Sequence, residues 1–378
     1  MVLTKYRLGD YIRRSTTNNR SLKYGAELIE GVTNEGVFAS PKGNPMDVDL
    51  KPYKIVNNGA FVYNPSRLDL GSIAYRTDGL CIVSHLYIVF YLNDKGKEKI
   101  DPEWLYIYFR RKQFYREVTF RNFGSQRPEF NFNDMSDILI PLPDITIQRK
   151  YVDVYKAMVA NQKSYERGLE DLKEAIDVLL DKVKHTSKPR PVGELLQEVD
   201  YRNEDGELTD VQGINIDKHF MPTVADTNGV NLRNYKVVKK GLFAYSGMQT
   251  GRDERIRIAL YDGNEPIIIS PAYSVFEVKD KTVLAEYIMV WFSRAESDRR
   301  GWFMSDSSIR TNLDLDRFYE IKIPVPDMKL QESIVDMYSS YVARSSISTT
   351  LKSQIKDICP ILIKGSLEDG ESRSARRR

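Results

Sequence analysis

Between residues 151 and 183 the apolar positions recur at alternating steps of four and three residues, the spacing of a helix with one apolar seam. At 1.5 Å per residue this seam is roughly 50 Å long. Charged residues such as Lys163, Glu170 and Lys173 occupy the remaining positions. A helix with a single apolar face needs a partner, so the pattern predicts one strand of a coiled coil over residues 144–187. The seam residues are Tyr151, Tyr155, Met158, Gln162, Tyr165, Leu169, Leu172, Ile176, Leu179 and Val183.

A second and weaker seam lies in residues 327–364, where serine and threonine dilute it and Pro360 is expected to limit it. Two similar seams in one chain most simply pair with each other in antiparallel fashion. Residues 365–378 show no periodicity and are predicted to form a disordered tail. The second seam contains Ile334, Met337, Tyr341, Ser348, Leu351, Ile355, Ile358 and Leu362.

Residues 1–143 and 188–326 have a different pattern, in which short apolar runs alternate with Gly, Asn and Pro. Runs such as 59–63 and 82–92 predict strands that are joined by turns. Residues 102–115 begin with a proline and carry apolar residues at helical spacing, which predicts a helix. We therefore predict an α+β protein with two tandem globular domains separated by two long helices. The helices are expected to form an antiparallel coiled-coil spacer in a pseudo-twofold dumbbell.

The two globular regions are copies of one unit. Ile-Pro-Leu-Pro at 140–143 returns as Ile-Pro-Val-Pro at 323–326, and Gln148 returns as Gln331 at an offset of 183 residues (331 − 148). The pair Leu-Gly at 8–9 returns as Val-Gly at 192–193. The matching pieces are mostly strand signals and turn glycines, whereas the stretches between them match poorly. Such a pattern is typical of a duplicated scaffold whose two sites read different targets.

Local charge is more informative than the net charge of +3. Residues 106–127 carry six basic residues and one acid, interleaved with aromatic residues, and further arginines cluster at 252–257 and 294–300. Basic groups beside aromatic rings suit a phosphate-lined surface, with an ordinary solvated helix face as the alternative.

The remaining composition indicates a cytoplasmic protein. Cys81 and Cys359 lie in apolar contexts and are expected to be buried free thiols in a reducing compartment. No apolar run approaches the roughly 20 residues that span a bilayer. The first residues also lack the apolar core of a signal peptide.

The chain carries little sign of chemistry of its own. Its histidines, His85, His185 and His219, stand outside metal-ligand spacings, and its two cysteines are too far apart in sequence to suggest zinc. Neither a Gly-Lys-Ser/Thr phosphate loop nor a Gly-x-Ser-x-Gly elbow is present. Asn-Pro-Ser-Arg at 64–67 departs from the Asn-Pro-Pro-aromatic motif of amino-methyltransferases, because Arg67 stands where a ring would stack on a flipped base. We therefore expect no catalytic residue and no metal site, and we interpret the chain as a recognition protein.

Taken in order and in duplicate, these motifs resemble the specificity subunits of type I restriction-modification systems. The resemblance covers residues 6–363 and rests on three features. They are Leu-Gly-Asp-Tyr-Ile at 8–12, Tyr-Asn-Pro-Ser-Arg-Leu-Asp-Leu-Gly-Ser-Ile at 63–73, and the repeated Ile-Pro-x-Pro followed by Gln and a long helix. The resemblance implies two target recognition domains, each of which reads one half of a bipartite site in double-stranded DNA. It also implies that the helices set the gap between the half-sites and dock two modification subunits.

The same resemblance implies that this chain binds no cofactor, because S-adenosylmethionine, ATP and Mg belong to the modification and restriction (translocase) subunits. Two alternatives stay open. One is the specificity subunit of a related type IIB-like system that cuts on both sides of its site. The other is a bivalent adaptor whose two domains bind proteins, and salt-dependent DNA binding would separate it from a DNA-recognition subunit.

Candidate DNA contacts are loop residues whose side chains suit the major groove, where Arg pairs with guanine and Gln with adenine. The matched pair Arg127 and Arg310 is expected to bind phosphate, which is the same in both half-sites, with salt bridges inside each domain as the structural alternative. The second domain departs from the pattern at 245–252, which places a role like that of Arg67 in doubt there. The DNA candidates are Arg67, Arg76, Arg121, Gln126, Arg127, Gln249, Arg252, Arg255, Arg257, Ser308 and Arg310. The candidates for the spacer and for partner binding are Tyr151, Tyr155, Met158, Tyr165, Leu169, Leu172, Ile176, Leu179, Tyr341, Leu351, Ile355 and Ile358.

Overall fold

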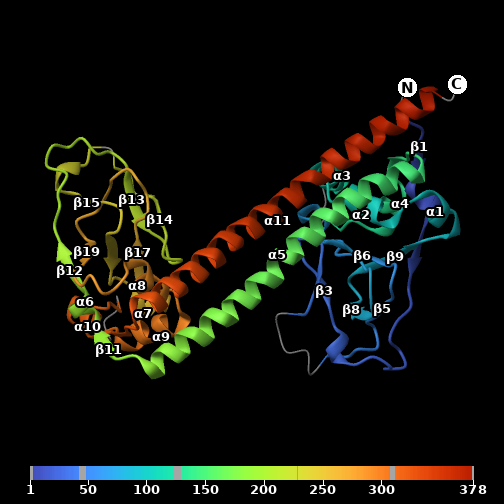
Figure 1. Ribbon diagram of the computed structural model, residues 1–378. Coiled ribbons are helices and arrows are strands. Elements are labelled where there is room, and N and C mark those ends of the chain that lie inside the picture. Colours follow the sequence, from blue (N-terminus) through green and yellow to red (C-terminus); the bar gives the residue numbers. More distant parts are fainter. Residues whose placement is uncertain (1–2, 42–47, 123–128, 228, 307–310, 377–378) are drawn as a thin grey trace. The chain divides into compact units, whose positions relative to one another are not determined.

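The computed structural model describes residues 3–41, 48–122, 129–227, 229–306 and 311–376. The chain divides into two compact units: unit 1 comprises Met1–Tyr165 with Ile347–Arg378, and unit 2 comprises Glu166–Ser346. Each unit is an α+β domain packed on parts of two long helices, α5 (Ile145–Thr186) and α11 (Met328–Arg376) (Figure 1). The predicted α+β class, with tandem domains and long helices, is confirmed. The dumbbell arrangement stays a prediction.

Unit 1 is built around an antiparallel four-stranded sheet with the order β2-β9-β6-β7. Its other strands form three two-stranded sheets, β3·β4, β5·β8 and β1·β10. Its elements are β1 (Lys5–Arg7), η1 (Leu8–Asp10), β2 (Ile12–Ser15), η2 (Ala26–Leu28), β3 (Gly31–Val32), β4 (Phe38–Ala39), β5 (Lys54–Val56), β6 (Phe61–Tyr63), η3 (Leu68–Leu70), β7 (Ile73–Tyr75), β8 (Cys81–Val83), β9 (Ile88–Leu92), α1 (Asp94–Lys99), α2 (Pro102–Phe109), α3 (Lys112–Arg121), α4 (Phe132–Ser136) and β10 (Leu139–Pro141).

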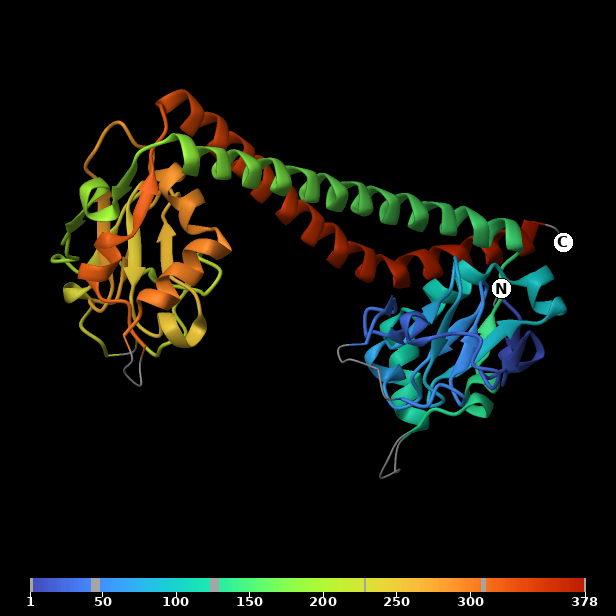
Figure 2. The ribbon, with the colours of Figure 1, turned by 90° about the horizontal axis from the view of Figure 1, so that it is seen from below.

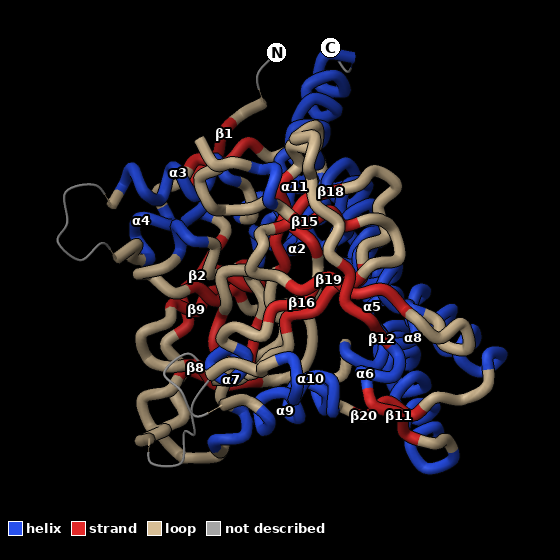
Figure 3. The backbone as a smooth tube through the Cα atoms, turned by 90° about the vertical axis from the view of Figure 1, so that its left-hand side faces the viewer, coloured by secondary structure: helices blue, strands red, loops and turns tan. Residues whose placement is uncertain are grey.

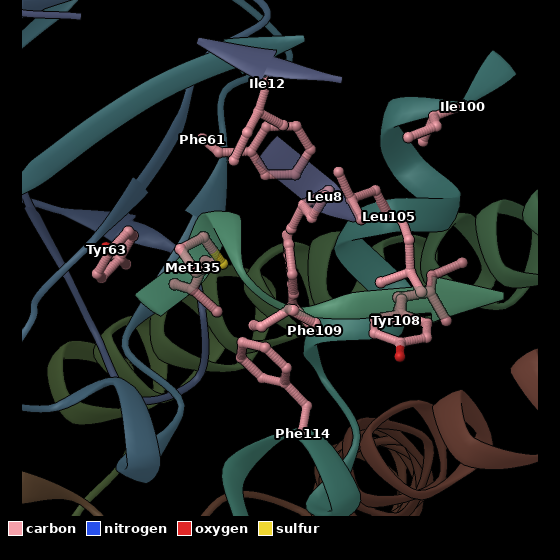
Figure 4. Packing of buried hydrophobic residues seen from close by; sticks show 14 of the residues in the cluster. Leu8, Ile12, Phe61, Tyr63, Ile100, Leu105, Tyr108, Phe109, Phe114 and Met135 are labelled. Atoms are coloured by element: carbon pink, nitrogen blue, oxygen red, sulfur yellow. The ribbon is translucent and has the colours of Figure 1, made fainter. Parts of the chain in front are cut away.

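The core of unit 1 lies between this sheet and the helices that follow it. Phe61 stacks on Phe90 of the neighbouring strand, with ring centroids 5.0 Å apart. Figure 4 shows Phe109 of α2 and Phe114 of α3 in the same cluster, together with Leu8 and Met135. Aromatic side chains bury the most surface per residue, so they dominate the stability of such a core.

The single helix predicted over residues 102–115 is in fact two helices. Helix α2 begins at Pro102, capped by the Asp101 carboxylate, and the chain turns at Arg110 and Arg111 before α3 begins. The break gives the buried guanidinium of Arg110 access to main-chain carbonyls, and it donates to the oxygens of Gly71 (2.6 Å) and Asn34 (3.3 Å). Helical periodicity continues across the break, which is why the sequence pattern did not reveal it.

Unit 2 repeats the arrangement. Its strands form one four-stranded sheet with the order β12-β19-β16-β17, a second with the order β14-β13-β18-β15, and the pair β11·β20. Its elements are β11 (Pro189–Pro191), α6 (Val192–Leu195), β12 (Leu196–Val199), β13 (Val211–Ile214), β14 (Phe220–Pro222), η4 (Leu232–Asn234), β15 (Lys236–Val238), β16 (Phe243–Ser246), α7 (Thr250–Asp253), β17 (Arg257–Leu260), β18 (Ile267–Ile269), β19 (Ser274–Val278), α8 (Ala285–Phe292), α9 (Ala295–Met304), α10 (Leu315–Glu320) and β20 (Lys322–Pro324).

The repeated sequence motifs occupy equivalent places in the two units. The first two residues of each Ile-Pro-x-Pro segment lie in β10 or β20, which pair antiparallel with β1 and β11. The repeated glycines lie where a side chain would collide: a Cβ on Gly9 would be 2.8 Å from the Cβ of Ser136, and one on Gly193 would be 3.0 Å from that of Tyr319. Position 9 therefore needs glycine for close packing, and position 193 leaves little room for a Cβ.

The two long helices pair antiparallel within each unit. In unit 1 the first part of α5 lies beside the last part of α11 (Figures 1 and 2), and Gln162 Nε2 donates to Ser348 Oγ at 3.4 Å. In unit 2 the last part of α5 is grouped with the first part of α11, and Ile176 and Ile334 belong to one apolar cluster.

The prediction of a disordered tail from residue 365 is wrong, because α11 continues through Pro360 and ends at Arg376. Its end belongs to unit 1: Ser366 is fully buried and accepts a hydrogen bond from Trp104 Nε1 at 3.0 Å. Two glycines of this segment are contact residues. A Cβ on Gly365 would lie 2.8 Å from Tyr151 Cε1, and one on Gly370 would lie 2.9 Å from Pro143 Cβ.

Candidate nucleic-acid interface

In unit 1 the predicted Asn-Pro-Ser-Arg motif forms a tight elbow between β6 and η3. Asn64 Oδ1 accepts from the Ser66 N–H (3.0 Å), and its carbonyl oxygen accepts from the Arg67 N–H (3.1 Å). The elbow ends at Gly71, whose φ of 99° is left-handed and whose added Cβ would meet the Asn34 oxygen at 2.6 Å. This backbone leaves the Arg67 side chain exposed at the surface.

The elbow is joined to the other predicted DNA-contacting segment of unit 1. The Phe130 N–H donates to the Pro65 oxygen at 3.0 Å, so the second residue after segment 123–128 is tied to the elbow. Helix α3, which leads into that segment, packs against η3. Arg121 lies at the end of α3, where it forms an exposed ion pair with Glu117 at 2.9 Å. The fold therefore brings together segments that are about 60 residues apart in the sequence.

Arg76 has a different environment. Its guanidinium forms an ion pair with Glu30 at 2.6 Å, lies over the ring of Phe38, and has a side chain that is only 14% exposed. Contact with DNA would require this largely buried pair to open. Its role in DNA binding stays a prediction.

Unit 2 has an equivalent elbow with different side chains. Gln249 takes a left-handed φ of 61° ahead of the short helix α7, and its N–H donates to Asn312 Oδ1 at 3.2 Å. The Gly251 N–H donates to the Thr311 oxygen (2.9 Å), and the Leu313 N–H donates to the Gly247 oxygen (2.9 Å). As in unit 1, the elbow is tied to the residues that follow a predicted reading segment, here 307–310.

The arginines of the second elbow surround a single carboxylate. Asp253 forms ion pairs with Arg252, at 2.8 Å, and with Arg257. These two guanidinium groups, Arg252 first, hold the pKa of Asp253 below its usual range. Arg252 also donates to Gln249 Oε1 at 2.7 Å, so the amide oxygen of Gln249 is already engaged. Arg255 lies apart from this group and pairs with Asp217 at 3.0 Å.

Four of the DNA candidates, Gln126, Arg127, Ser308 and Arg310, fall outside the described residues, so their roles stay predictions. For the others, the fold places Arg67 and Arg121 on the joined segments of unit 1, and it places Gln249, Arg252 and Arg257 on the elbow of unit 2. In Figure 3, α7 of that elbow lies close to α9, the helix that leads into residues 307–310.

The spacer candidates lie on the inner sides of the helix pair. All of them are buried or half-buried; Tyr151, Tyr155 and Ile358 contact the core cluster of unit 1, and Ile176, Leu179 and Tyr341 belong to that of unit 2. The heptad pattern missed Val152 and Leu180, which are 2% and 1% exposed and belong to the core clusters of unit 1 and unit 2.

A groove of about 460 Å³ in unit 2 runs between α5, α8, α9 and α11. Ile176, Leu180, Tyr338 and Tyr341 give it an apolar floor, and Arg294 and Glu296 line its edge. An apolar groove with charged edges beside the helices is the kind of surface that another protein subunit covers.

No cluster of three or more His, Cys, Asp or Glu side chains is arranged to hold a metal ion among the described residues. None of the described helices is long and apolar enough to cross a bilayer.

A family model for the "type I restriction modification DNA specificity domain" matches residues 4–173 and 242–357. The chain therefore belongs to this family, with two copies of the domain in tandem, and it is a DNA sequence-recognition subunit of a restriction-modification complex. A search of curated protein sequences found no match.

Among solved structures, the chain is similar in fold to the type I restriction-modification S subunit from M. genitalium. It is 14% identical, the match covers 96% of this chain and 95% of that one, and the TM-score is 0.60, which shows a shared fold. The HsdS subunit from Thermoanaerobacter tengcongensis is 15% identical over 96% of both chains, with a TM-score of 0.40. A chain from a structure on assembly and conformational transition of the type I R-M system is 15% identical over 97% of both chains, with a TM-score of 0.48.

Proposed function

We propose that each unit reads one half of a bipartite site in double-stranded DNA through its elbow and the segment tied to it. The observation that carries this proposal is the matched construction of the two elbows. In both units a main-chain hydrogen bond joins the elbow to residues that follow a predicted DNA-contacting segment, while the side chains of the elbows differ. A fixed backbone with variable side chains is what two related sites with different base sequences require.

The paired helices set the distance between the two half-sites and dock two modification subunits. Methyl transfer, ATP-driven translocation and cleavage belong to the modification and restriction subunits, which hold S-adenosylmethionine, ATP and Mg. This chain carries no catalytic group and no cofactor of its own, and it acts in the cytoplasm. A type IIB-like complex would use the chain in the same way and would differ in cutting both sides of the site.

An exchange of one whole unit tests this function. Because unit 2 is the continuous segment Glu166–Ser346, it can be replaced by the matching segment of another specificity subunit with both junctions inside the long helices. The heptad register must be preserved at each junction. The methylome of cells that express the hybrid with its modification subunits should show one half of the recognised sequence changed and the other intact. A motif altered in both halves contradicts the proposal.

The spacer is tested by lengthening both helices together. Four residues inserted between 165 and 166 and four between 346 and 347 keep the pairing within each unit and add about 6 Å. The gap between the half-sites should then grow by one or two base pairs at about 3.4 Å each. A methylated motif with an unchanged gap contradicts the spacer role. A bivalent protein adaptor would instead show no salt-dependent DNA binding in the assembled complex.

A further inference from the structure

Phe120 and Phe303 are large apolar side chains that the fold leaves in solvent. They are 82% and 77% exposed, and each is the penultimate residue of its helix, α3 or α9. Full burial of a phenylalanine contributes about 1.5–3 kcal/mol, and neither ring provides this to its own unit. The two positions are equivalent at the offset of 183 residues (303 − 120).

An exposed arginine stands one helical turn before each ring. Arg116 and Arg299 precede Phe120 and Phe303 by four residues, so each arginine and its phenylalanine share one helix face. When α3 and α9 are aligned at this offset, the arginine and the phenylalanine are the only identical residues. Even the buried positions differ, with Val118 replaced by glycine.

Identity at exposed positions, where buried ones have changed, is not explained by packing. Surface residues tolerate replacement better than core residues, so a feature that survives only on the surface points to a shared external partner. That partner must present the same chemistry to both units. An aromatic ring with a cation one turn away is suited to a base stack and its flanking phosphate.

The local surroundings of the pair favour DNA. In unit 1 a shallow, open hollow of about 470 Å³ between η3 and α3 is lined by Phe120 and Arg116 together with Lys112 and Asp69. The helix then leads through Arg121 into segment 123–128. In unit 2, α9 packs against α7 of the elbow and leads toward segment 307–310. Each pair therefore lies shortly before a segment that carries predicted DNA contacts.

We propose that Phe120 and Phe303 are matched DNA contacts, one for each half-site, in which the ring packs against the edge of the base stack and the arginine one turn earlier binds a phosphate. This inference rests on the proposed function. Because the pair is the same in two units that read different sequences, it supplies affinity and positioning rather than base choice. The elbows and their attached segments remain the readers of sequence.

The two members of each pair should have different signatures in a salt titration of the assembled complex on the cognate duplex. Phe120→Ala and Phe303→Ala should each weaken binding by about tenfold with an unchanged salt slope, because an apolar contact releases no counterion. Arg116→Ala and Arg299→Ala should lower the slope by about one unit. Phe120→Trp should restore affinity, and the matched control Leu86→Ala, at a residue that is 64% exposed, should leave it unchanged. The methylated motif should stay the same in every variant.

Photocrosslinking identifies the partner directly. Benzoylphenylalanine placed at position 120 or 303 in the assembled, DNA-bound complex should crosslink to the duplex. The modification subunit is the competing partner, because Arg299 also borders the groove beside the long helices. Crosslinks to that subunit alone, crosslinks to neither, or unchanged affinity in both alanine variants would overturn the inference. If the wild-type complex itself fails to bind a bipartite duplex, the proposed function fails as well.

Discussion

Replacement of Gln148 by leucine tests the framework that both units share. Gln148 is fully buried at the start of α5, and its amide bridges three main-chain groups. Nε2 donates to the oxygens of Lys99 and Pro143, both at 2.9 Å, and Oε1 accepts from the Asp101 N–H at 2.8 Å. Gln331 makes the equivalent bonds in unit 2 at 2.9, 2.9 and 3.0 Å. Leucine keeps most of the volume but leaves all three groups without this partner.

Each buried main-chain group that loses its partner costs about 1–3 kcal/mol, so Gln148→Leu should destabilise unit 1 by at least about 3 kcal/mol. For a unit of this size the melting temperature should fall by roughly 6–12 °C. Hydrogen exchange should also show faster exchange at the Asp101 amide, with the core amides of unit 2 unaffected. Gln331→Leu should produce the mirror effect in unit 2.

The chain offers a matched control in Gln162, which is 7% exposed but makes one long side-chain bond. Gln162→Leu should cost less than about 1 kcal/mol. If Gln148→Leu proves no more destabilising than this control, the bridging role of the glutamine is refuted.

Three further changes have definite expected outcomes. Leu180→Asp should lower the free energy of unfolding, measured in urea, by several kcal/mol more than Leu172→Asp, because Leu180 is 1% exposed whereas Leu172 is half-buried. Burial raises the pKa of the Cys81 thiol to about 12 and that of Cys359 to about 11, so neither should react with a thiol reagent at pH 8 before denaturation. Because these folded values exceed the unfolded value of 9.0, stability should fall as the pH rises from about 9 toward 11–12. Truncation after Lys364 removes the acceptor of the buried tryptophan bond and should lower the melting temperature of unit 1.

The scaffold could be predicted from the sequence because its signals are local or repeated. Heptad spacing identified both long helices, and the duplicated Ile-Pro-x-Pro and Gln motifs identified the two units. The end of α11 could not be predicted, because its contacts come from Trp104 and Tyr151, more than 200 residues away in the sequence. Without those contacts, a glycine that is needed for close packing has the same sequence signature as one in a flexible linker.

The candidate site was predictable at the level of segments rather than side chains. The sequence indicated the motif at 64–67 and the arginine cluster at 252–257, and in the fold the elbow at each place is joined to residues that follow a predicted DNA-contacting segment. The sequence could not indicate that Arg76 forms an ion pair with Glu30. Nor could it indicate that the side-chain oxygen of Gln249 accepts a hydrogen bond from Arg252, because both interactions depend on the folded structure. Nor did it single out Phe120, because exposure is a property of the folded chain.

Because the chain contains two copies of one unit, equivalent residues of the two units can be compared. This comparison separates residues that hold the fold together from residues that contact a partner. A residue that is the same in both units and buried, such as Gln148 with Gln331, is explained by the main-chain groups that it satisfies. A residue that is the same in both units and exposed has no such internal explanation. Phe120 and Phe303 are of the second kind, so the constraint on them lies outside the chain. For a DNA sequence-recognition subunit, both the DNA backbone and the modification subunits are partners that the two units can share, and the place of each pair next to a predicted DNA-contacting segment favours the DNA backbone.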